Sequence, residues 1–160
     1  MKKTFGILVL FIMIISLIAC SKETVKIKEE DVLNFVKDYK AEQYNIKDPS
    51  NPPSGIEIGE KVKGFFSDEE FEKQMANRVF QIAPDIAKKT NKSIELEDVK
   101  LEKEKENEDG TINYKYTLIL KFYDDKASDV IEKKGELTIE GLKIIRDWEE
   151  RTTKIGNEVF

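Results

Sequence analysis

The stretch that decides the fold is TINYKYTLILKFY, residues 111–123. Apolar and mostly polar side chains alternate along it. Its apolar and aromatic members share one face at a period of two: Ile112, Tyr114, Tyr116, Leu118, Leu120 and Phe122. Because successive side chains of a strand point to opposite faces of a sheet, this pattern predicts a strand with one buried face. Such a strand is typical of an antiparallel sheet that is covered on one side only.

Three further strands are predicted around this one. Residues 94–106 alternate and end in the charged run EKEKE, and the pair Asp109-Gly110 that follows is a hairpin signal. In residues 130–140 the apolar face also carries Lys133 and Gly135. After a turn at Gly141, residues 142–151 are expected to place Leu142, Ile144, Arg146 and Trp148 on the inner face and Asp147 on the opposite, solvent-facing side. The second half of the chain is thus predicted to be a four-stranded antiparallel meander.

The first half is predicted to be helical. Apolar side chains at helical spacing and three acidic residues in the first turn indicate a helix over residues 29–44. The proline-rich stretch 47–55 predicts a loop, and residues 59–66 form a short apolar piece. Ser67 and Glu70 match a capping box ahead of one continuous apolar helix face, made by Phe71, Met75, Val79 and Ile82. Pro84 is expected to end or kink that helix, or to open a further turn.

These elements predict an α+β fold in which two or three N-terminal helices pack on one side of a curved, four-stranded antiparallel sheet. The domain is expected to span residues 29–151, which is a suitable length for a single core. Residues 152–160 are expected to form a loose C-terminal tail.

The N-terminus has the features of an export signal. Lys2 and Lys3 precede an apolar run that ends at Cys20, the only cysteine in the chain. From Phe5 to Ala19 this run would be about 22 Å long as a helix, which is short for a bilayer core of about 30 Å. Polar residues follow at once. An uncleaved anchor helix and an incidental core cysteine are the alternatives to a cleaved signal peptide.

The end of the run, Leu17-Ile18-Ala19-Cys20, resembles the lipobox of bacterial lipoproteins. The resemblance implies cleavage between Ala19 and Cys20, so that residues 1–19 are removed as a signal peptide. It also implies a diacylglycerol on the Cys20 thiol, with residues 20–28 as a lipidated tether. The protein would then be attached to the outer, extracytoplasmic face of the cell membrane. Two acyl chains give a durable anchor where a single chain gives marginal binding.

Composition excludes several classes of function. The net charge of −5, without a basic cluster, argues against nucleic-acid binding, and it would become −7 on loss of Lys2 and Lys3. The absence of histidine excludes imidazole as a base or as a zinc ligand. The acidic turn at residues 124–129 does not match a calcium loop, so no metal and no cofactor are expected.

The EKEKE run is more typical of a protected strand edge than of a recognition strip. The richness in Lys, Glu, Ile and Asn suggests a Gram-positive host of low GC content.

The element order, with SDEEFEKQMANR in the helical half and GLKIIRDWEE as the closing strand, resembles the nuclear-transport-factor-2-like superfamily. A cystatin-like arrangement is the nearest rival. The resemblance implies a cone with a cavity between sheet and helices, which some members use for catalysis and many for binding. The possible cavity-lining residues are Tyr114, Tyr116, Arg78 and Arg146.

No catalytic set emerges from these residues, because tyrosines are large strand residues and a solvent-facing Asp147 would be an ordinary strand position. We therefore expect a non-catalytic domain that binds an envelope protein or a small envelope ligand. The alternatives are a cavity enzyme of the isomerase or dehydratase type, with Asp147 or the tyrosines transferring protons, and an immunity or exclusion lipoprotein.

Overall fold

The structure is a computed structural model that describes residues 28–151, 154–155 and 158–159. The predicted signal peptide and the Cys20 lipobox lie outside the described residues, as does the predicted tether apart from Lys28. The helices are α2 (Glu29–Tyr44), α3 (Gly55–Val62), α4 (Asp68–Ala76) and α5 (Ile82–Thr90), with 3₁₀ turns η2 (Lys63–Phe65) and η3 (Val79–Gln81). The strands are β1 (Ser93–Glu106), β2 (Ile112–Tyr123), β3 (Ser128–Glu140) and β4 (Lys143–Glu149), and two short strands, β5 (Lys154–Ile155) and β6 (Glu158–Val159), pair with each other.

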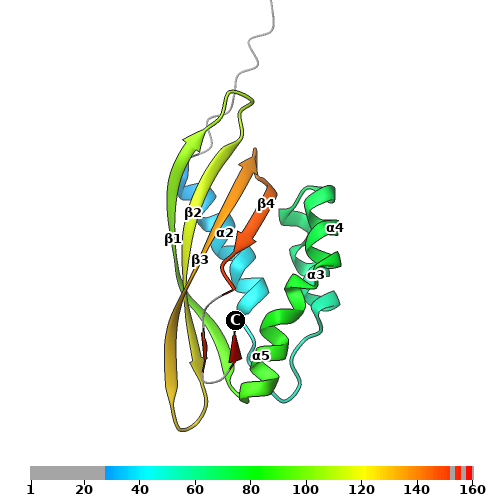
Figure 1. The fold of residues 1–160 in the computed structure, drawn as a ribbon, viewed down its shortest axis with the longest axis vertical. Helices are drawn as coiled ribbons and strands as arrows, with labels where there is room; N and C mark the ends of the chain where they lie inside the picture. Colours follow the sequence, from blue (N-terminus) through cyan, green and yellow to red (C-terminus); the bar gives the residue numbers. More distant parts are fainter. Residues whose placement is uncertain (1–27, 152–153, 156–157, 160) are drawn as a thin grey trace, which may run out of the picture.

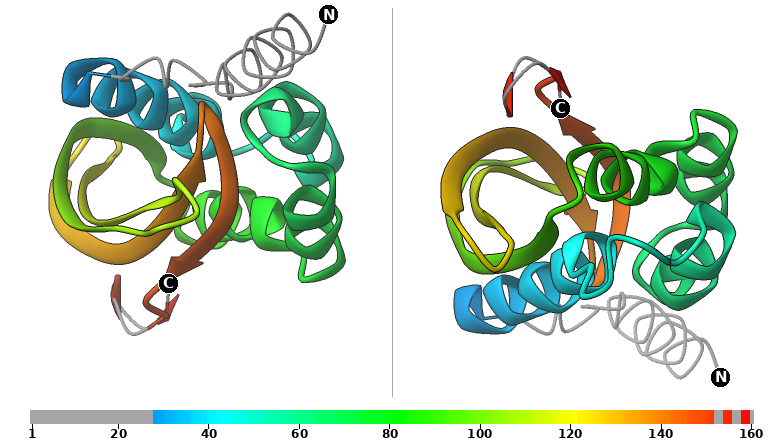
Figure 2. Two further views of the ribbon diagram at one scale, coloured as in Figure 1. Left: turned by 90° about the horizontal axis from the view of Figure 1, so that it is seen from above. Right: turned by 90° about the horizontal axis from the view of Figure 1, so that it is seen from below.

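The four long strands form one antiparallel sheet in the order β1-β2-β3-β4, which confirms the predicted meander and the α+β class. Figure 1 shows α2 running along the concave side of the sheet, with α3, α4 and α5 grouped beside β4. Seen along the long axis, the strands curl into a partial cylinder (Figure 2). Among the described residues, no helix has the length and apolar character needed to cross a membrane.

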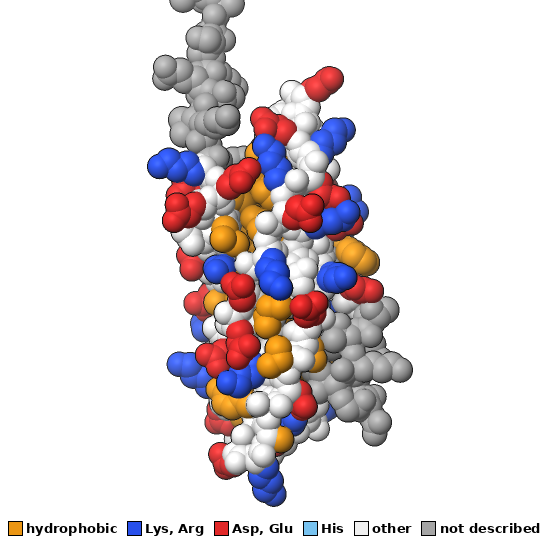
Figure 3. Space-filling model, turned by 90° about the vertical axis from the view of Figure 1, so that its left-hand side faces the viewer, with side chains coloured by type: hydrophobic (Ala, Val, Ile, Leu, Met, Phe, Trp, Pro, Cys, Tyr) orange, Lys and Arg blue, Asp and Glu red, His pale blue; other side chains and the backbone are white. Residues whose placement is uncertain are grey.

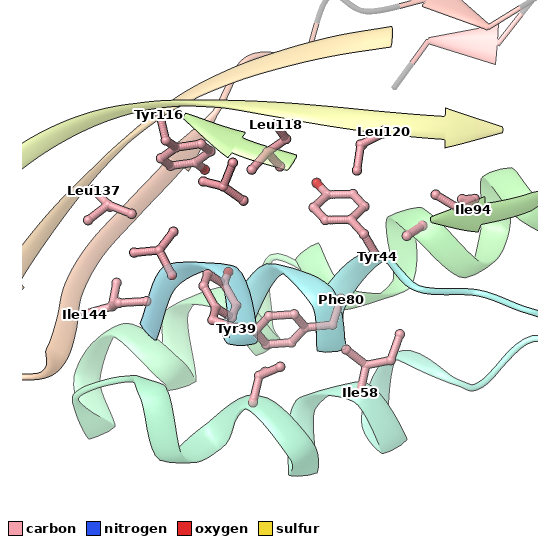
Figure 4. Close-up of a cluster of buried hydrophobic side chains, with 14 of the residues drawn as sticks. Tyr39, Tyr44, Ile58, Phe80, Ile94, Tyr116, Leu118, Leu120, Leu137 and Ile144 are labelled. Atoms are coloured by element: carbon pink, nitrogen blue, oxygen red, sulfur yellow. The ribbon is translucent and has the colours of Figure 1, made fainter. Parts of the chain in front are cut away.

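The helix α2 has the predicted bounds. Its first turn carries Glu29, Glu30 and Asp31, whose charges complement the positive end of the helix dipole. Its buried stripe contains two valines, two tyrosines, Lys40 and Gln43. This stripe faces the concave side of the sheet, where β2 buries the inner set that its alternation predicted, apart from a half-buried Ile112. Figure 4 shows the resulting core between α2, the sheet and α3.

The other helices differ from the prediction in their boundaries. A helix, α3, begins at Gly55, the last residue of the predicted loop, and runs into the stretch expected to be only an apolar piece. A full capping box between Ser54 and Glu57 starts it. Ser67 does cap α4 through the backbone N–H of Glu70, but the Glu70 side chain turns into the core. The predicted continuous face from Phe71 to Ile82 is wrong, because α4 ends at Ala76 and Arg78 has a left-handed φ of 55°.

Pro84 lies in the first turn of α5 and does not end a helix. Its missing N–H costs nothing there, because the first N–H groups of a helix have no partner within the helix. Pro84 thus opens a further helical turn, which is one of the two outcomes predicted for it.

A β-bulge in β4 overturns the predicted faces of that strand. Thr138 pairs with Arg146, but the next residue, Ile139, pairs with Ile144, so Ile145 is an extra residue in β4. One extra residue shifts the alternation by one position. Ile144 is therefore buried as expected, while Trp148 is 53% exposed and Asp147 points inward. Leu142, in the turn, is 45% exposed.

The convex face of the sheet carries interleaved acidic and basic side chains with groups of apolar side chains between them (Figure 3). Lys115 stands opposite Glu102 on β1 and Glu136 on β3, and its Nζ lies 2.5 Å from a Glu104 oxygen. Opposite charges on neighbouring strands stabilise a sheet modestly. The EKEKE run thus pairs within the sheet, which supports its structural interpretation.

Candidate functional site

Lys40 is the centre of a polar cluster inside the core. It lies on the buried stripe of α2, and its side chain is fully buried. Its ammonium donates to Asp147 Oδ2 at 2.7 Å, to Gln43 Oε1 at 3.2 Å and to a Glu149 carboxylate oxygen. The rings of Tyr39 and Tyr116 face the same ammonium, with centroids 4.3 and 4.8 Å away. Aromatic faces stabilise a cation, and more strongly when it is desolvated.

The inward-facing carboxylate of Asp147 accepts hydrogen bonds on both of its oxygens. Its Oδ2 accepts hydrogen bonds from Lys40 and from the Tyr39 hydroxyl, and its Oδ1 accepts one from the Tyr116 hydroxyl, each at 2.7 Å. Tyr44 donates to the other cluster carboxylate, that of Glu149. Figure 4 shows Tyr39 and Tyr44 projecting from α2 toward the sheet strand that carries Tyr116.

A second lysine balances the charge of the cluster. The Lys133 side chain is 3% exposed on β3, where its Nζ lies 3.8 Å from Glu149 Oε2 and donates to the Glu150 carbonyl at 2.7 Å. Two ammonium groups thus accompany two carboxylates, those of Asp147 and Glu149. A buried ionic cluster of zero net charge avoids the large cost of an uncompensated buried charge.

Helix α4 closes the edge of β4 next to this cluster. Glu70 Oε1 accepts from the backbone N–H of Asp147 at 3.0 Å, and Gln74 donates to the Asp147 carbonyl at 2.8 Å. Gln74 also donates to Glu70 at 2.6 Å. The two side chains therefore take the place that a neighbouring strand would have at this residue.

The pKa directions agree with fixed donor and acceptor roles. Burial, followed by the nearby carboxylates, raises the pKa of Tyr39, Tyr44 and Tyr116 well above the ordinary value, so all three remain donors. Burial acts to raise the pKa of Glu149, but the charges of Lys40 and Lys133 outweigh it and leave this pKa lowered. No buried side-chain polar atom among the described residues lacks a hydrogen-bond partner. Within the described residues, the donors and acceptors of the cluster are thus partnered with one another.

An open cleft of about 280 Å³ adjoins the cluster, between β4 and the segment from α4 to α5. The residues that line it include the apolar Val79, Ile82 and Trp148 and the acidic Asp147 and Glu149. Four cations also line it: Lys73, Lys133, Arg146 and Arg151. In the part of the chain that the structure describes, no group of three or more His, Cys, Asp or Glu could hold a metal ion.

The structure brings together only part of the set predicted to line a cavity. Tyr116 belongs to the buried cluster, and Tyr114, two residues earlier on β2, is buried outside it. Arg146 is exposed and reaches the cleft from the outer side of β4, so its predicted inward position is wrong. Arg78 lines a separate hollow with Ile56 and Met75. The expectation of a solvent-facing Asp147 is also wrong, because the bulge at Ile145 turns it inward.

Sequence reasoning missed Lys40 and Glu149. A signal existed for Lys40, which follows Val32 and Val36 at intervals of four residues and therefore continues the apolar stripe of α2. Glu149 gave no signal, since its inward position depends on the bulge.

Comparisons with known proteins bear on the fold. No family model matches the chain, and no curated protein matches it. Among solved structures, the TraH protein of the Gram-positive conjugative plasmid pIP501 is 15% identical, with a TM-score of 0.52 over 82% of this chain and 98% of that one. The periplasmic domain of DotI is 8% identical, with a TM-score of 0.54 over 79% of this chain and 98% of that one.

A third similar structure is an IcmL-like type IV secretion system protein from Legionella pneumophila. It is 10% identical, with a TM-score of 0.53 over 81% of this chain and 96% of that one. A protein described as Ntf2-like and involved in plasmid conjugation also matches, but its TM-score of 0.46 is too low to place the chain in that superfamily. At these identities the similarities establish a shared fold.

Proposed function

We propose that this protein is a lipid-anchored, extracytoplasmic interaction domain of a conjugation or type IV secretion apparatus in the cell envelope. It would be held at the membrane through Cys20 and would bind another protein of that apparatus, without catalysing a reaction.

The observation that carries the proposal of a non-catalytic domain is that the carboxylates of the Lys40 cluster accept hydrogen bonds from inside the protein. A general base needs a carboxylate or amine that can reach a substrate proton. Here both oxygens of Asp147 accept hydrogen bonds from inside the protein, and its side chain is 3% exposed. The three cluster tyrosines donate to the cluster carboxylates. The cluster therefore stabilises the fold beneath the cleft.

Two further observations support the proposed location at the membrane and the proposed role in a conjugation or secretion apparatus. The lipobox-like sequence Leu17–Cys20 supports export and anchoring. The three similar structures with a TM-score above 0.5 include a protein of a conjugative plasmid, a type IV secretion protein and a periplasmic domain. A shared fold alone does not fix a function, so the assignment needs a direct test.

Anchoring is tested with Cys20→Ser in the native host. We expect the variant to remain an unprocessed precursor or to leave the membrane fraction, and metabolic labelling with a fatty acid should be lost. Unchanged size, labelling and membrane association would contradict the anchor.

The interaction is tested by crosslinking in intact cells, followed by mass spectrometry of the attached proteins. We expect one reproducible envelope partner encoded with a transfer or secretion system. The Cys20→Ser strain is the control, because loss of anchoring should reduce that crosslink. A host without such a system, or a wild-type chain that captures nothing above background, would contradict the proposal.

A further inference from the structure

The cleft beside β4 has a positively charged rim although the chain is acidic. Arg146 and Arg151 lie on either side of the exposed Trp148 along the chain, and Lys73 lies across the cleft on α4. The chain as a whole carries a net charge of −5. A local concentration of positive charge against that background selects for an acidic ligand.

The acidic residues that line the cleft do not neutralise its arginines. Asp147 and Glu149 already pair with Lys40, which is buried behind them. Lys73 pairs with Glu70 at 3.1 Å. Within the described residues, Arg146 and Arg151 form no ion pair. Two guanidinium groups thus remain available to carboxylates, which they can bind in a bidentate manner.

The backbone of β4 indicates the conformation of the ligand. The Asp147 peptide groups point away from β3 and are covered by Glu70 and Gln74. Because backbone groups alternate sides along a strand, those of Glu149 also point away from β3, on the same edge of β4 as those of Asp147. The hydrogen bond from the Glu150 N–H to the Lys134 carbonyl, at 2.9 Å, is consistent with this alternation. Since the Asp147 groups are already bonded, Glu149 offers the outward-facing backbone groups with which an extended peptide can hydrogen-bond here.

We infer that the cleft between β4 and α4–α5 binds an acidic, extended peptide segment of a partner protein, with Arg146 and Arg151 holding its carboxylates and Trp148 packing on its apolar side chains. The volume of about 280 Å³ is room for a few peptide side chains. This inference rests on the proposed function, since it names the partner class of an interaction domain.

Trp148 is the only tryptophan of the chain, so its fluorescence reports directly on the cleft. The probe is a decapeptide of alternating Glu and Val, and a Lys-Val decapeptide is the matched control. We expect a saturable change in Trp148 fluorescence with the Glu-Val peptide, weakened at least tenfold by raising the salt concentration from 50 to about 500 mM.

The rim is tested with the double variant Arg146→Glu/Arg151→Glu. It should lose at least tenfold in affinity for the Glu-Val peptide. The control Lys100→Glu/Lys126→Glu makes the same change in net charge at exposed positions outside the cleft, and it should bind almost as tightly as wild type. Equal losses in both double variants would overturn the site, as would equal binding of the two peptides or no saturable response.

A photo-crosslinking residue at position 148, compared with one at Val130, separates this inference from the proposed function. Val130 lies on β3 and is 56% exposed. A partner captured from position 148 supports both proposals. A partner captured only from position 130 would overturn the cleft and leave the interaction function standing. Capture from neither position would overturn both.

Discussion

Lys40 holds two carboxylates inside the protein, and its removal would leave them without a full counter-charge. Its ammonium contacts both Asp147 and Glu149. Breaking a buried ion pair by removing one partner costs about 3–5 kcal/mol. We therefore expect Lys40→Met, which keeps most of the side-chain volume, to lower the free energy of unfolding by that amount in urea denaturation.

The matched control lies one turn earlier on the same helix. Lys37 pairs with Asp98 at 3.0 Å, but both side chains are more than 40% exposed. Such surface pairs contribute less than about 1 kcal/mol. Lys37→Met should therefore unfold close to wild type. A loss for Lys40→Met as small as that for Lys37→Met would show that the Lys40 cluster does not stabilise the fold.

The lowered pKa of Glu149 predicts a loss of stability in acid. Its native pKa lies below the ordinary value of 4.5, so the unfolded state takes up this proton first as the pH falls. The stabilisation is complete above the unfolded pKa and is lost as the pH falls through the native one. We expect the free energy of unfolding to decrease below about pH 4.5, measured by urea denaturation from pH 7 to pH 3.

Glu149→Gln tests the assignment of this acid sensitivity. The variant should be less stable than wild type at pH 7, because Lys40 loses a counter-charge, but the difference should shrink as the pH falls. A difference that stays constant from pH 7 to pH 3 would show that another group causes the acid sensitivity.

At the scale of elements, the close packing of β2, β3 and β4 depends on Gly135. A Cβ added there would lie 2.3 Å from Cζ of Tyr116 and 2.6 Å from the Trp148 carbonyl oxygen. Overpacking of this kind costs about 1–3 kcal/mol. We expect Gly135→Ala to be destabilised by that amount in thermal or urea unfolding. Gly64→Ala is the control, because a Cβ there meets nothing within 4 Å, and a comparable loss in it would contradict the explanation.

The elements that the sequence predicts well are those with a long, regular period. The alternation of residues 112–122 and the stripe of residues 29–44 identify β2 and α2 because burial on one face repeats at a fixed interval. In β4 the alternation of inward and outward side chains is shifted by one residue after Ile145. A bulge changes the alternation through one extra residue, and nothing in the local composition of KIIRDWE marks it. Simple alternation therefore places Asp147 and Glu149 on the wrong side of β4.

At the scale of the whole molecule, the two ends of the domain differ in their distance from the proposed anchor. The start of α2 and the turn between β1 and β2 lie at one end, while the turn between β2 and β3 lies at the other (Figure 1). Glu29 lies close enough to Lys103 and Tyr114 to affect the pKa of both, which places the start of α2 beside this first turn. From Cys20 to Glu29 the chain can extend at most about 30 Å. An anchor at Cys20 thus keeps the end with α2 and the β1–β2 turn near the membrane.

This orientation predicts unequal energy transfer to a dye in the lipid headgroups. Glu108→Cys and Asp125→Cys each add one exposed thiol, in the turns at opposite ends of the sheet, and the lipidated protein would be labelled at that thiol after reconstitution into vesicles. We expect stronger transfer from position 108, because it lies at the end that the tether holds. The same labels on the Cys20→Ser chain should give no transfer. Equal or reversed transfer in the lipidated protein would mean that the domain folds back toward the bilayer, which would change the access of a partner to the cleft beside β4.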